Sequence, residues 1–303
     1  MELLPGYQRL IRARHGYVLY NRNDTVIGRL IEAYGEYFES EVDAFRRFLA
    51  PGDVALDIGA NIGVHTLALA EIVGPSGAVI AFEPQRYVFQ GLCANVALNS
   101  LTNVHCVNAA VGDVAARLHF ADPDPRVPNN FGGAGLDALA AAPHALPVAQ
   151  LVLDDYLAGW RPRLIKVDVE GMEAAVLRGG QRLIDAARPV LYVENDRADR
   201  SGDLIRLLLG FRYRVFWHLA PYLRASNYFG RADRLFPIAL VDRGGPLLEP
   251  IGVAVNLLCV PAEHALPIAG LREVGDAAEH PFRRDAAGGF ALPGGAPVPV
   301  VRA

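Results

Sequence analysis

The sequence predicts an open α/β sheet with helices on both faces, and three observations support this fold class. A glycine-rich turn joins a buried strand to a helix near residue 60, strands and helices then alternate along the chain, and acids follow three of the strands. Parallel strands in such a sheet place their carboxyl ends at one edge, which is where ligands bind. The three acids are therefore expected to share one site.

The glycine-rich turn is the strongest of these signals. Val54–Ile58 is a short apolar run that contains Asp57 and predicts a buried strand. Gly59 and Gly63 follow it, and because neither carries a Cβ atom, the backbone there can approach a ligand closely. From Val64 the apolar residues have helical spacing. A strand, a glycine turn and a helix in this order form the nucleotide-binding corner of an open sheet.

Asp57 distinguishes this corner from a dinucleotide site. Such a site directs backbone N–H groups at a pyrophosphate, which a carboxylate would repel. A ligand with positive charge, such as the ammonium and sulfonium of S-adenosylmethionine, suits Asp57 better. Asn61 between the glycines can adopt a left-handed backbone conformation. A nicotinamide-dependent oxidoreductase is disfavoured, since its G-x-G-x-x-G turn is absent.

Two further acids follow predicted strands. Glu83 comes directly after the strand 78–82 and 20 positions after Gly63, where doubly wound folds place an acid on the ribose hydroxyls. Asp168 follows the strand 164–167 and is expected on the ligand side of the sheet. Each acid could instead have a structural role, for example as a cap of the next helix. Small residues at 108–112 leave room for an adenine ring.

Other polar residues near strand ends are candidates for chemistry. Glu170 is expected in the first turn of a helix over 172–177, where the helix dipole alone favours an acid. Glu194 and Asn195 follow the strand 189–193 and, together with Asp168, could hold a divalent cation or cap a loop. His218 ends the strand 213–217 and is a candidate base, although a histidine beside aromatic residues is often structural.

The remaining elements complete a three-part division of the chain. Segment 1–38 is expected to form a hairpin or cap, 39–261 the main domain, and 262–303 a loosely packed tail that covers the domain or supports self-association. Further helices are predicted over 39–49, 88–98 and 204–209, a short helix from 154, and further strands over 104–107, 115–121, 148–153 and 253–260. The connection 219–250 is long and aromatic-rich, which is typical of a functional loop.

Composition limits the class of protein. The 303 residues are 52% hydrophobic and 20% charged, which is enough apolar material for a substantial core. A net charge of −4 argues against a nucleic-acid partner. Three cysteines without metal-type spacing, and no signal-peptide or membrane-spanning run, predict reduced thiols in a cytoplasmic protein.

Taken together, the motifs resemble the FkbM-type family of S-adenosylmethionine-dependent methyltransferases over roughly residues 39–261. The most specific segment is Ile165–Glu173, which includes Asp168 and Glu170. The other matching segments are Asp57–Gly63, Ala81–Pro84, Ala109–Gly112, Leu153–Asp155, Val176–Gly179, Arg188-Pro189 with Glu194, Asn227–Phe229 and Val255–Leu258. The resemblance implies the class I methyltransferase fold, a seven-stranded, mostly parallel sheet whose last strand is antiparallel. It also implies O-methylation of a hydroxyl on a sugar, glycan or natural-product acceptor.

On this interpretation the cofactor is S-adenosylmethionine, with Asp57 near its amino-acid end, Glu83 on its ribose and Asp168 near its methionine or methyl group. The predicted cofactor-binding residues are Asp57, Gly59, Asn61, Gly63, Thr66, Glu83, Ala110, Val111 and Asp168. The acceptor pocket is expected from residues 1–40, Asn129–Gly133 and 219–250.

Methyl transfer to an alcohol requires positioning of the oxygen and removal of its proton. The candidate bases are Glu170, His218 and Asp168. A divalent metal at Asp168, Glu194 and Asn195, as in catechol-type O-methyltransferases, is an alternative that we do not favour. N-methylation, a peptide acceptor and a non-catalytic cofactor-binding scaffold also stay open.

Overall fold

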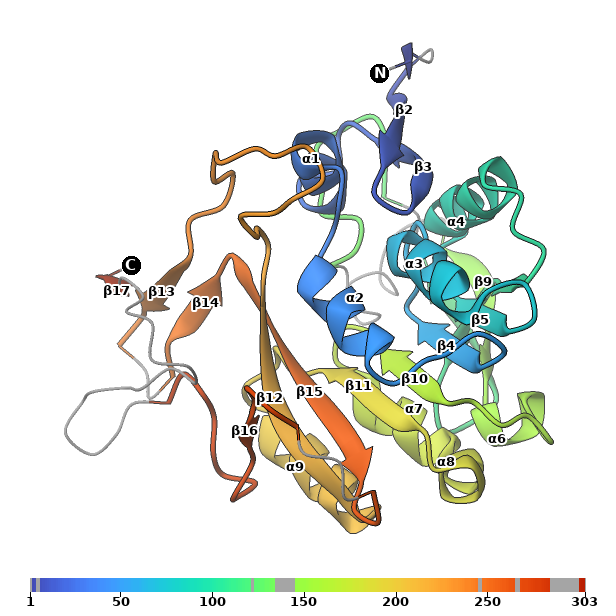
Figure 1. Cartoon of the computed structure of the whole chain (residues 1–303), viewed down its shortest axis with the longest axis vertical. Helices are drawn as coiled ribbons and strands as arrows, with labels where there is room; N and C mark the ends of the chain where they lie inside the picture. The colour runs from blue at the N-terminus through green and yellow to red at the C-terminus, as the bar shows by residue number, and fades with distance from the viewer. Residues whose placement is uncertain are drawn as a thin grey trace.

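The computed structural model describes residues 2–3, 6–120, 123–133, 145–244, 247–264, 268–283 and 300–302. Its centre is an eight-stranded sheet in the order β16-β12-β15-β11-β10-β4-β5-β6 (Figure 1). The strands, in chain order, are β4 (Val54–Ile58), β5 (Ala78–Phe82), β6 (Val104–Val107), β10 (Leu164–Val167), β11 (Val190–Glu194), β12 (Tyr213–Pro221), β15 (Val253–Pro261) and β16 (Arg272–Glu273).

The predicted α/β fold class is confirmed, with one more strand than expected. Strands β4, β5, β6, β10 and β11 pair in parallel, whereas β15 lies antiparallel between β11 and β12. These seven strands have the arrangement expected of a class I methyltransferase sheet. The eighth, β16, is a two-residue strand that pairs with the edge of β12 through Phe216 and Trp217.

Helices cover both faces of this sheet, because alternate side chains along each strand point to opposite sides. On one face α2 (Glu39–Arg46) and α3 (Val64–Val73) bury an apolar cluster that includes Phe45 and Tyr192, and α4 (Arg86–Leu98) packs beside them. On the other face lie α6 (Leu153–Tyr156), α7 (Glu173–Gly179), α8 (Gln181–Ala187) and α9 (Ser201–Gly210). No helix in the described ranges combines the length and apolar character needed to cross a bilayer.

The N-terminal segment forms a small three-stranded sheet of β1 (Glu2–Leu3), β2 (Gln8–Ala13) and β3 (Gly16–Asn21), followed by α1 (Ile27–Tyr34). A hairpin or cap was expected here, but α1 was not. Asn95 of α4 and Asn99, which directly follows this helix, bind the backbone of β3. Asn95 exchanges hydrogen bonds with the backbone of Leu19 at 2.6 and 3.1 Å, and Asn99 does so with Tyr17 at 2.8 and 2.7 Å. The cap is therefore attached to the main domain by specific side chains.

Two more small sheets flank the centre. One contains β7 (Ala109–Val111), β8 (Ala116–Phe120) and β9 (Leu146–Leu151), so the residues expected beside an adenine ring form a strand. The other contains β13 (Ala239–Asp242), β14 (Glu249–Ile251) and β17 (Val300–Arg302). The connection 219–250 thus contains strands that the sequence did not reveal.

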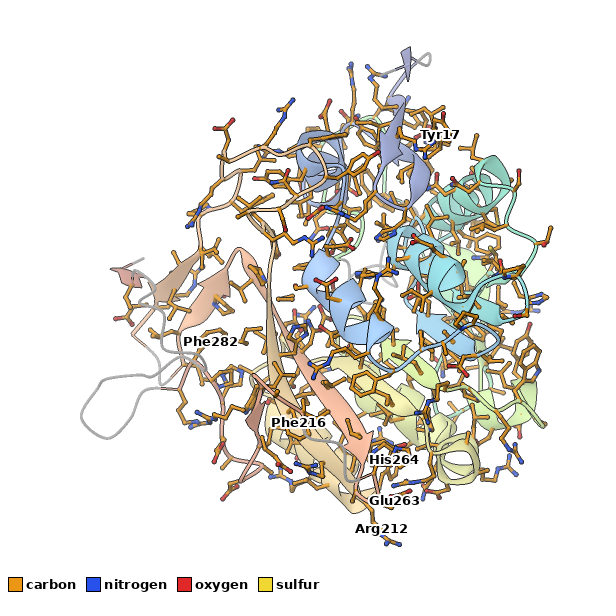
Figure 2. The ribbon with its side chains drawn as sticks, in the orientation of Figure 1. Tyr17, Arg212, Phe216, Glu263, His264 and Phe282 are labelled. Atoms are coloured by element: carbon orange, nitrogen blue, oxygen red, sulfur yellow. The ribbon has the colours of Figure 1, made fainter. Side chains whose placement is uncertain are left out.

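The C-terminal segment is better packed than the predicted loose tail, as far as it lies within the described residues. Phe282, labelled in Figure 2, is buried in the same cluster as Trp217 of β12. The ring of His280 lies between them, 5.7 Å from Trp217 and 5.9 Å from Phe282. Residues 265–267, 284–299 and 303 of the predicted tail lie outside the described residues.

Candidate active site

A cavity of about 850 Å³ opens at the carboxyl ends of the central strands. Its inner half is lined by the turn after β4, by the end of β5 and by the segments after β10 and β11. Its outer half is lined by the segment from α1 to α2, the loop near 130, and the region 222–256. All three segments expected to form an acceptor pocket contribute, through Val26, Ile27, Tyr37, Phe38, Asn130, Gly132, Gly133, Tyr222, Leu247, Glu249 and Pro250.

The glycine turn has the left-handed backbone that its sequence predicts. The φ angles are 81° at Gly59, 50° at Asn61 and 88° at Gly63. A Cβ atom on Gly59 would lie 1.7 Å from the backbone oxygen of Asp168, so only glycine lets these two segments approach each other. Gly59 and Asn61 line the cavity. Gly63 does not line it, and its Cα faces Leu92 of α4 instead.

Glu83 lies at the cavity wall and is held by the backbone. Its Oε2 accepts a hydrogen bond from the Asn61 N–H at 3.0 Å, and its Oε1 accepts one from the Gln85 N–H at 2.8 Å. Each carboxylate oxygen keeps a second lone pair, which can accept a hydrogen bond from a ligand hydroxyl. Burial raises the pKa of Glu83 to about 7 despite these backbone bonds.

Asp57 behaves differently, and the predicted direct contact with the cofactor needs correction. Its side chain is 0% exposed and does not line the cavity. Its Oδ2 accepts a hydrogen bond from the Thr66 hydroxyl at 2.6 Å, and its Oδ1 lies 3.2 Å from the Lys166 ammonium. Thr66 is equally buried and likewise lies outside the cavity wall. Asp57 is therefore paired inside the protein, and Lys166 is the neighbour that connects it to the cavity.

Lys166 lines the cavity and was not among the residues singled out from the sequence. It lies in the buried strand β10 and is 2% exposed, yet it lines the inner end of the cavity. Its ammonium donates to the Gly59 carbonyl at 3.2 Å and lies 3.4 Å from Asp168 Oδ2. Burial acts to lower the pKa of Lys166, but Asp57, Asp168 and Glu41 outweigh it and raise the pKa. A sequence signal existed, because Lys166 is the only lysine in the chain, against 28 arginines.

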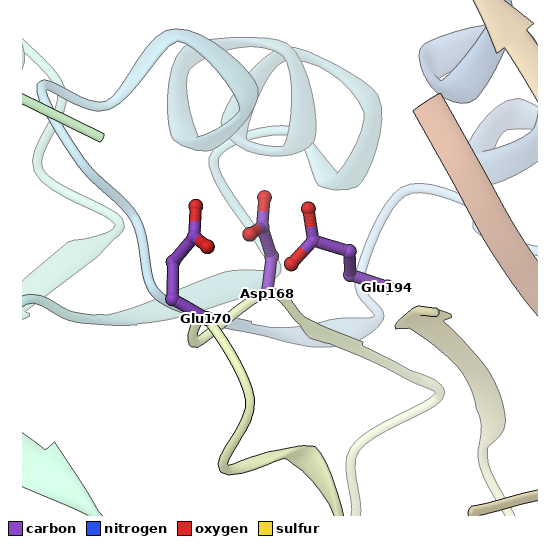
Figure 3. Close-up of side chains that lie close together, drawn as sticks. All are labelled: Asp168, Glu170 and Glu194. Atoms are coloured by element: carbon purple, nitrogen blue, oxygen red, sulfur yellow. The ribbon is translucent and has the colours of Figure 1, made fainter. Parts of the chain in front are cut away.

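Three carboxylates gather beside this lysine. Asp168, Glu170 and Glu194 point toward one another in Figure 3, and one oxygen of each lies within 4.8 Å of the others. Burial and the charge of Asp168 raise the pKa of Glu170 to about 7 and also raise the pKa of Glu194. Glu194 Oε2 is buried and has no hydrogen-bond partner among the described residues. The cluster therefore favours a cationic occupant.

Glu170 reaches this cluster from a different position than predicted. Helix α7 begins at Glu173, so Glu170 lies in the preceding turn, with a φ of 54°. Its Oε2 pairs with Arg197 at 2.7 Å. Glu173 is the acid of the first helical turn, and it accepts a hydrogen bond from the Gly171 N–H at 2.9 Å. A left-handed conformation at a residue other than glycine is uncommon and occurs frequently at functional sites.

Two other predicted residues lie away from the cavity. His218 does not end its strand, because β12 continues to Pro221. It faces Tyr192 across the sheet, with Nδ1 2.6 Å from the tyrosine hydroxyl, and burial lowers its pKa to about 4. Asn195 is buried and donates to the Ser201 hydroxyl at 2.8 Å. Among the described histidines, cysteines and acids, Glu170 forms a candidate metal-binding group with Asp168 and Glu194, and Asn195 does not line the cavity.

The wall expected near an adenine ring is formed by Ala110 and Val111 of β7 together with Phe120. Gln85 also lines this part of the cavity, and its Nε2 donates to the Phe131 carbonyl at 3.0 Å. Its Oε1 is buried and has no partner within the described structure. A ligand that donates a hydrogen bond would satisfy this atom.

Comparison with known proteins identifies the domain. A family model described as the methyltransferase FkbM domain matches residues 57–215, which is more than half of the chain. The chain belongs to the FkbM methyltransferase family. The match of this FkbM domain begins at Asp57 and ends in β12, so α1, α2, β13, β14 and β15 lie outside it.

Relatives of this FkbM domain include Methyltransferase 1 from Beauveria bassiana (strain ARSEF 2860). It is 29% identical over 145 residues, which are 41% of this chain and 57% of that protein. A crystal structure of methyltransferase FkbM from Methylobacillus flagellatus KT is 19% identical, with a TM-score of 0.40, and the match covers 61% of this chain and 48% of that one. The chain therefore spans about half the length of these two relatives.

A SAM-dependent O-methyltransferase from Thermotoga maritima is also similar, with 12% identity and a TM-score of 0.43 over 84% of this chain and 77% of that one.

Proposed function

We propose that this FkbM domain transfers a methyl group from S-adenosylmethionine to a hydroxyl oxygen of a neutral glycan or natural-product acceptor. The observation that carries the proposal is the arrangement of acids around the cavity, because Glu83, Asp168, Glu170 and Glu194 all line it. When bound, the cofactor supplies an electrophilic methyl group on a positively charged sulfur.

The residues present fit this cofactor. Glu83 offers two oxygens to ribose hydroxyls, and the unpartnered Oε1 of Gln85 can accept a hydrogen bond from the nucleoside. Ala110 and Val111 give a flat, apolar wall. Asp168, held by Lys166, lies at the inner end and can stabilise the cationic end of the ligand.

The charges of the cavity also limit the acceptor. Eight acids line it, namely Glu41, Glu83, Asp168, Glu170, Glu194, Asp196, Asp199 and Glu249, against the two bases Lys166 and Arg197. Both bases already have acidic partners, since Lys166 pairs with Asp57 and Asp168, and Arg197 pairs with Glu170 and Asp196. A phosphate or carboxylate on the acceptor would therefore lie among acids and find neither base unpaired. Aromatic rings at Tyr37, Phe38 and Tyr222 suit a sugar face or a hydroxylated apolar molecule.

The acidic lining favours one second candidate, which is methylation of an amine nitrogen. A protonated amine would be attracted by the same charges. It must lose its proton before it can attack the methyl carbon, so its reaction rate would rise steeply with pH. A hydroxyl acceptor must also lose its proton, so the atom that carries the transferred methyl group in the product separates the two acceptors.

A divalent cation at Asp168, Glu170 and Glu194 is an alternative way to activate the acceptor. The closeness of the three carboxylates and the unpartnered Glu194 oxygen fit such an ion. The ion would act as a Lewis acid that lowers the pKa of the acceptor hydroxyl. Undiminished turnover of a Glu194→Gln variant in the presence of a chelator would exclude this arrangement.

The experiment that tests the proposal offers methyl-labelled S-adenosylmethionine with matched acceptors. Neutral oligosaccharides and neutral phenols are compared with their phosphorylated and carboxylated counterparts. We expect the labelled methyl group to be bound to a hydroxyl oxygen of a neutral acceptor, as a methyl ether. The rate of transfer should be at least about tenfold higher than with the anionic counterpart. Label transferred only to phosphorylated acceptors would contradict the proposal. Cofactor binding without transfer to any member of the set would favour the scaffold alternative.

A further inference from the structure

A chain of polar side chains leads from the cavity into the sheet. Glu41 of α2 lines the cavity and is only 4% exposed. Its Oε1 accepts a hydrogen bond from Asn256 at 2.9 Å. A side-chain hydrogen bond also joins Glu41 to the hydroxyl of Tyr192 on β11. That hydroxyl lies 2.6 Å from Nδ1 of His218, whose ring is partly exposed.

The hydroxyl of Tyr192 has one proton and two neighbours that compete for it. When Glu41 is ionised, Tyr192 donates to the carboxylate and must accept from His218, which then carries its proton on Nδ1. When Glu41 is protonated, it donates to Tyr192, and Tyr192 donates to His218, which then carries its proton on Nε2. The protonation state of Glu41 and the tautomer of His218 are therefore linked.

A second observation places the acceptor beside Glu41. Nε2 of His65 is buried and has no hydrogen-bond partner in the described part of the chain. It lies 3.6 Å from Glu41 Oε2, which is too long for a good hydrogen bond, and both residues line the cavity. Burial lowers the pKa of His65 to about 3, so its ring is neutral near pH 7. A ligand hydroxyl can satisfy both atoms when it accepts a hydrogen bond from the proton on His65 Nε2 and donates its own proton to Glu41.

We propose that Glu41 is the catalytic base that takes the acceptor's proton, and that Tyr192 and His218 carry this proton out of the cavity. This inference rests on the proposed methyl transfer to a hydroxyl group. It assigns roles to two residues outside the matched family region, Glu41 and His218, of which only His218 was a sequence candidate. His218 is a positioning residue for proton exit and does not touch the acceptor.

The proton balance is complete. The acceptor oxygen forms a bond to the methyl carbon as the carbon–sulfur bond breaks, the electron pair leaves on sulfur, and the hydroxyl proton passes to Glu41. Once Glu41 is protonated, His218 exchanges its Nδ1 proton for one on Nε2 through solvent, with no net uptake of protons, and Tyr192 turns its hydroxyl toward Nδ1. One proton then moves along each hydrogen bond, from Glu41 to Tyr192 and from Tyr192 to His218 Nδ1. Loss of the Nε2 proton to solvent leaves Glu41 ionised and His218 neutral.

The electrostatic surroundings suit these roles. Burial raises the pKa of Glu41 to about 8, close to the pH at which a base works best, while Lys166 opposes the shift and Asp168 adds to it. Tyr37, His65, Tyr192 and Asn256 are the other polar side chains that act on it from neighbouring elements. Burial and Arg47 lower the pKa of His218 to about 4, so its doubly protonated ring is short-lived and does not trap the proton.

The test measures the His218 tautomer by ¹⁵N NMR of the histidine-labelled, ligand-free protein between pH 6 and 9.5. A His218→Asn variant assigns the signals. We expect the Nε2–H form at low pH and the Nδ1–H form at high pH, with a midpoint near 8. Glu41→Gln should lock the Nε2–H form, and Tyr192→Phe should abolish the pH dependence. Tyr213→Phe removes a buried hydroxyl that bonds Pro189 in the same sheet and should change nothing.

Binding and turnover complete the design. Glu41→Gln should keep the Kd for S-adenosylhomocysteine within about threefold while lowering kcat about 100-fold or more. A tautomer that does not respond to pH, or that responds equally in Glu41→Gln, overturns the relay. If Glu41→Gln instead weakens the binding of S-adenosylhomocysteine more than about 30-fold, the base role is overturned, and Glu41 is assigned to binding the ammonium group of that ligand. If the wild-type protein does not bind S-adenosylhomocysteine, the proposed function fails, whereas the tautomer result still decides whether the link exists.

Discussion

The inner and outer halves of the cavity are built in different ways. The inner half uses strand ends and one glycine turn, so its polar groups are fixed by neighbouring backbone, as Glu83 is by two N–H groups. The outer half is assembled from separate segments that ion pairs hold together. There Glu36 binds Arg14 at 2.8 Å, Arg224 at 3.2 Å and the Tyr228 N–H at 2.8 Å. The positions of the inner groups are thus set by the sheet and its turns, whereas the outer half depends on contacts between side chains.

This difference indicates which half of the cavity would select the acceptor. The matched family region, 57–215, contains the inner half almost completely, whereas most of the outer half lies outside it. Under the proposed function, the inner half would hold the cofactor and the outer half the acceptor. The predictions below test the two halves against each other.

The largest effect is expected from Lys166→Met, which removes the buried ammonium group of the inner half. Asp57 would keep a buried charge without its ammonium partner, and breaking a buried pair in this way costs about 3–5 kcal/mol. The free energy of unfolding, measured with urea, should fall by that amount. Arg182→Met breaks pairs with Asp154 and Asp155 through an exposed guanidinium and should change the free energy of unfolding far less. Equal losses in the two variants would contradict the inner-half assignment.

The next effect concerns the cofactor itself. Glu83→Gln should weaken binding of S-adenosylhomocysteine by about 10- to 100-fold. The reason is that the carboxylate proposed to accept hydrogen bonds from the ribose hydroxyls is replaced by a neutral amide. Calorimetry measures the change. Glu249→Gln alters an acid of the outer half and should leave the Kd within about twofold. The division into two halves would be wrong if both variants bound the cofactor equally badly.

Stability should fall as pH rises from 7 to 8.5. Burial raises the pKa of Glu41 to about 8 in the folded protein, so the fold retains a proton that the unfolded chain has already lost. Stabilisation from such a group is lost as pH rises through the folded pKa, here by about 1–2 kcal/mol. Histidines with lowered pKa values contribute no slope in this window, because the unfolded chain is already neutral there.

Calorimetric unfolding of ligand-free protein measures this effect. The melting temperature should decline over the window in the wild-type protein and decline less in Glu41→Gln, which cannot ionise at that position. A melting temperature that rises between pH 7 and 8.5 would contradict the assignment of a buried, protonated Glu41.

The smallest effect is expected where the cap joins the main domain. Asn99→Ala removes the two hydrogen bonds to the Tyr17 backbone and should cost about 1 kcal/mol. Hydrogen exchange at β3 should accelerate, while exchange in β4 stays unchanged. Faster exchange in both strands would show that the cap and the inner half unfold together.

The inner half was largely predictable from sequence because its signals are local. Asn61 adopts the left-handed backbone expected between two glycines, and Glu83 follows its strand directly. Asp57 was placed correctly on its strand but given the wrong neighbour, because the contact that satisfies it comes from Lys166, far away in the chain. A buried lysine in an apolar strand gives no periodicity signal, although its being the only lysine was visible.

The outer half could not be derived in the same way. Glu41 looked like one acid among several on an amphipathic helix, and its burial depends on Asn256 and Tyr192, which lie in two distant strands. His218 looked like a strand-end base because the extra length of β12 was not predicted. Such residues acquire their roles only when the sheet brings the strands together.

Calorimetry of the wild-type protein with S-adenosylmethionine, S-adenosylhomocysteine and NAD tests the central claim most directly. We expect both sulfur ligands to bind at one site and NAD to show no binding, because the acids that line the inner half suit a cation and repel a pyrophosphate. Binding of NAD, or failure of both sulfur ligands to bind, would contradict the account.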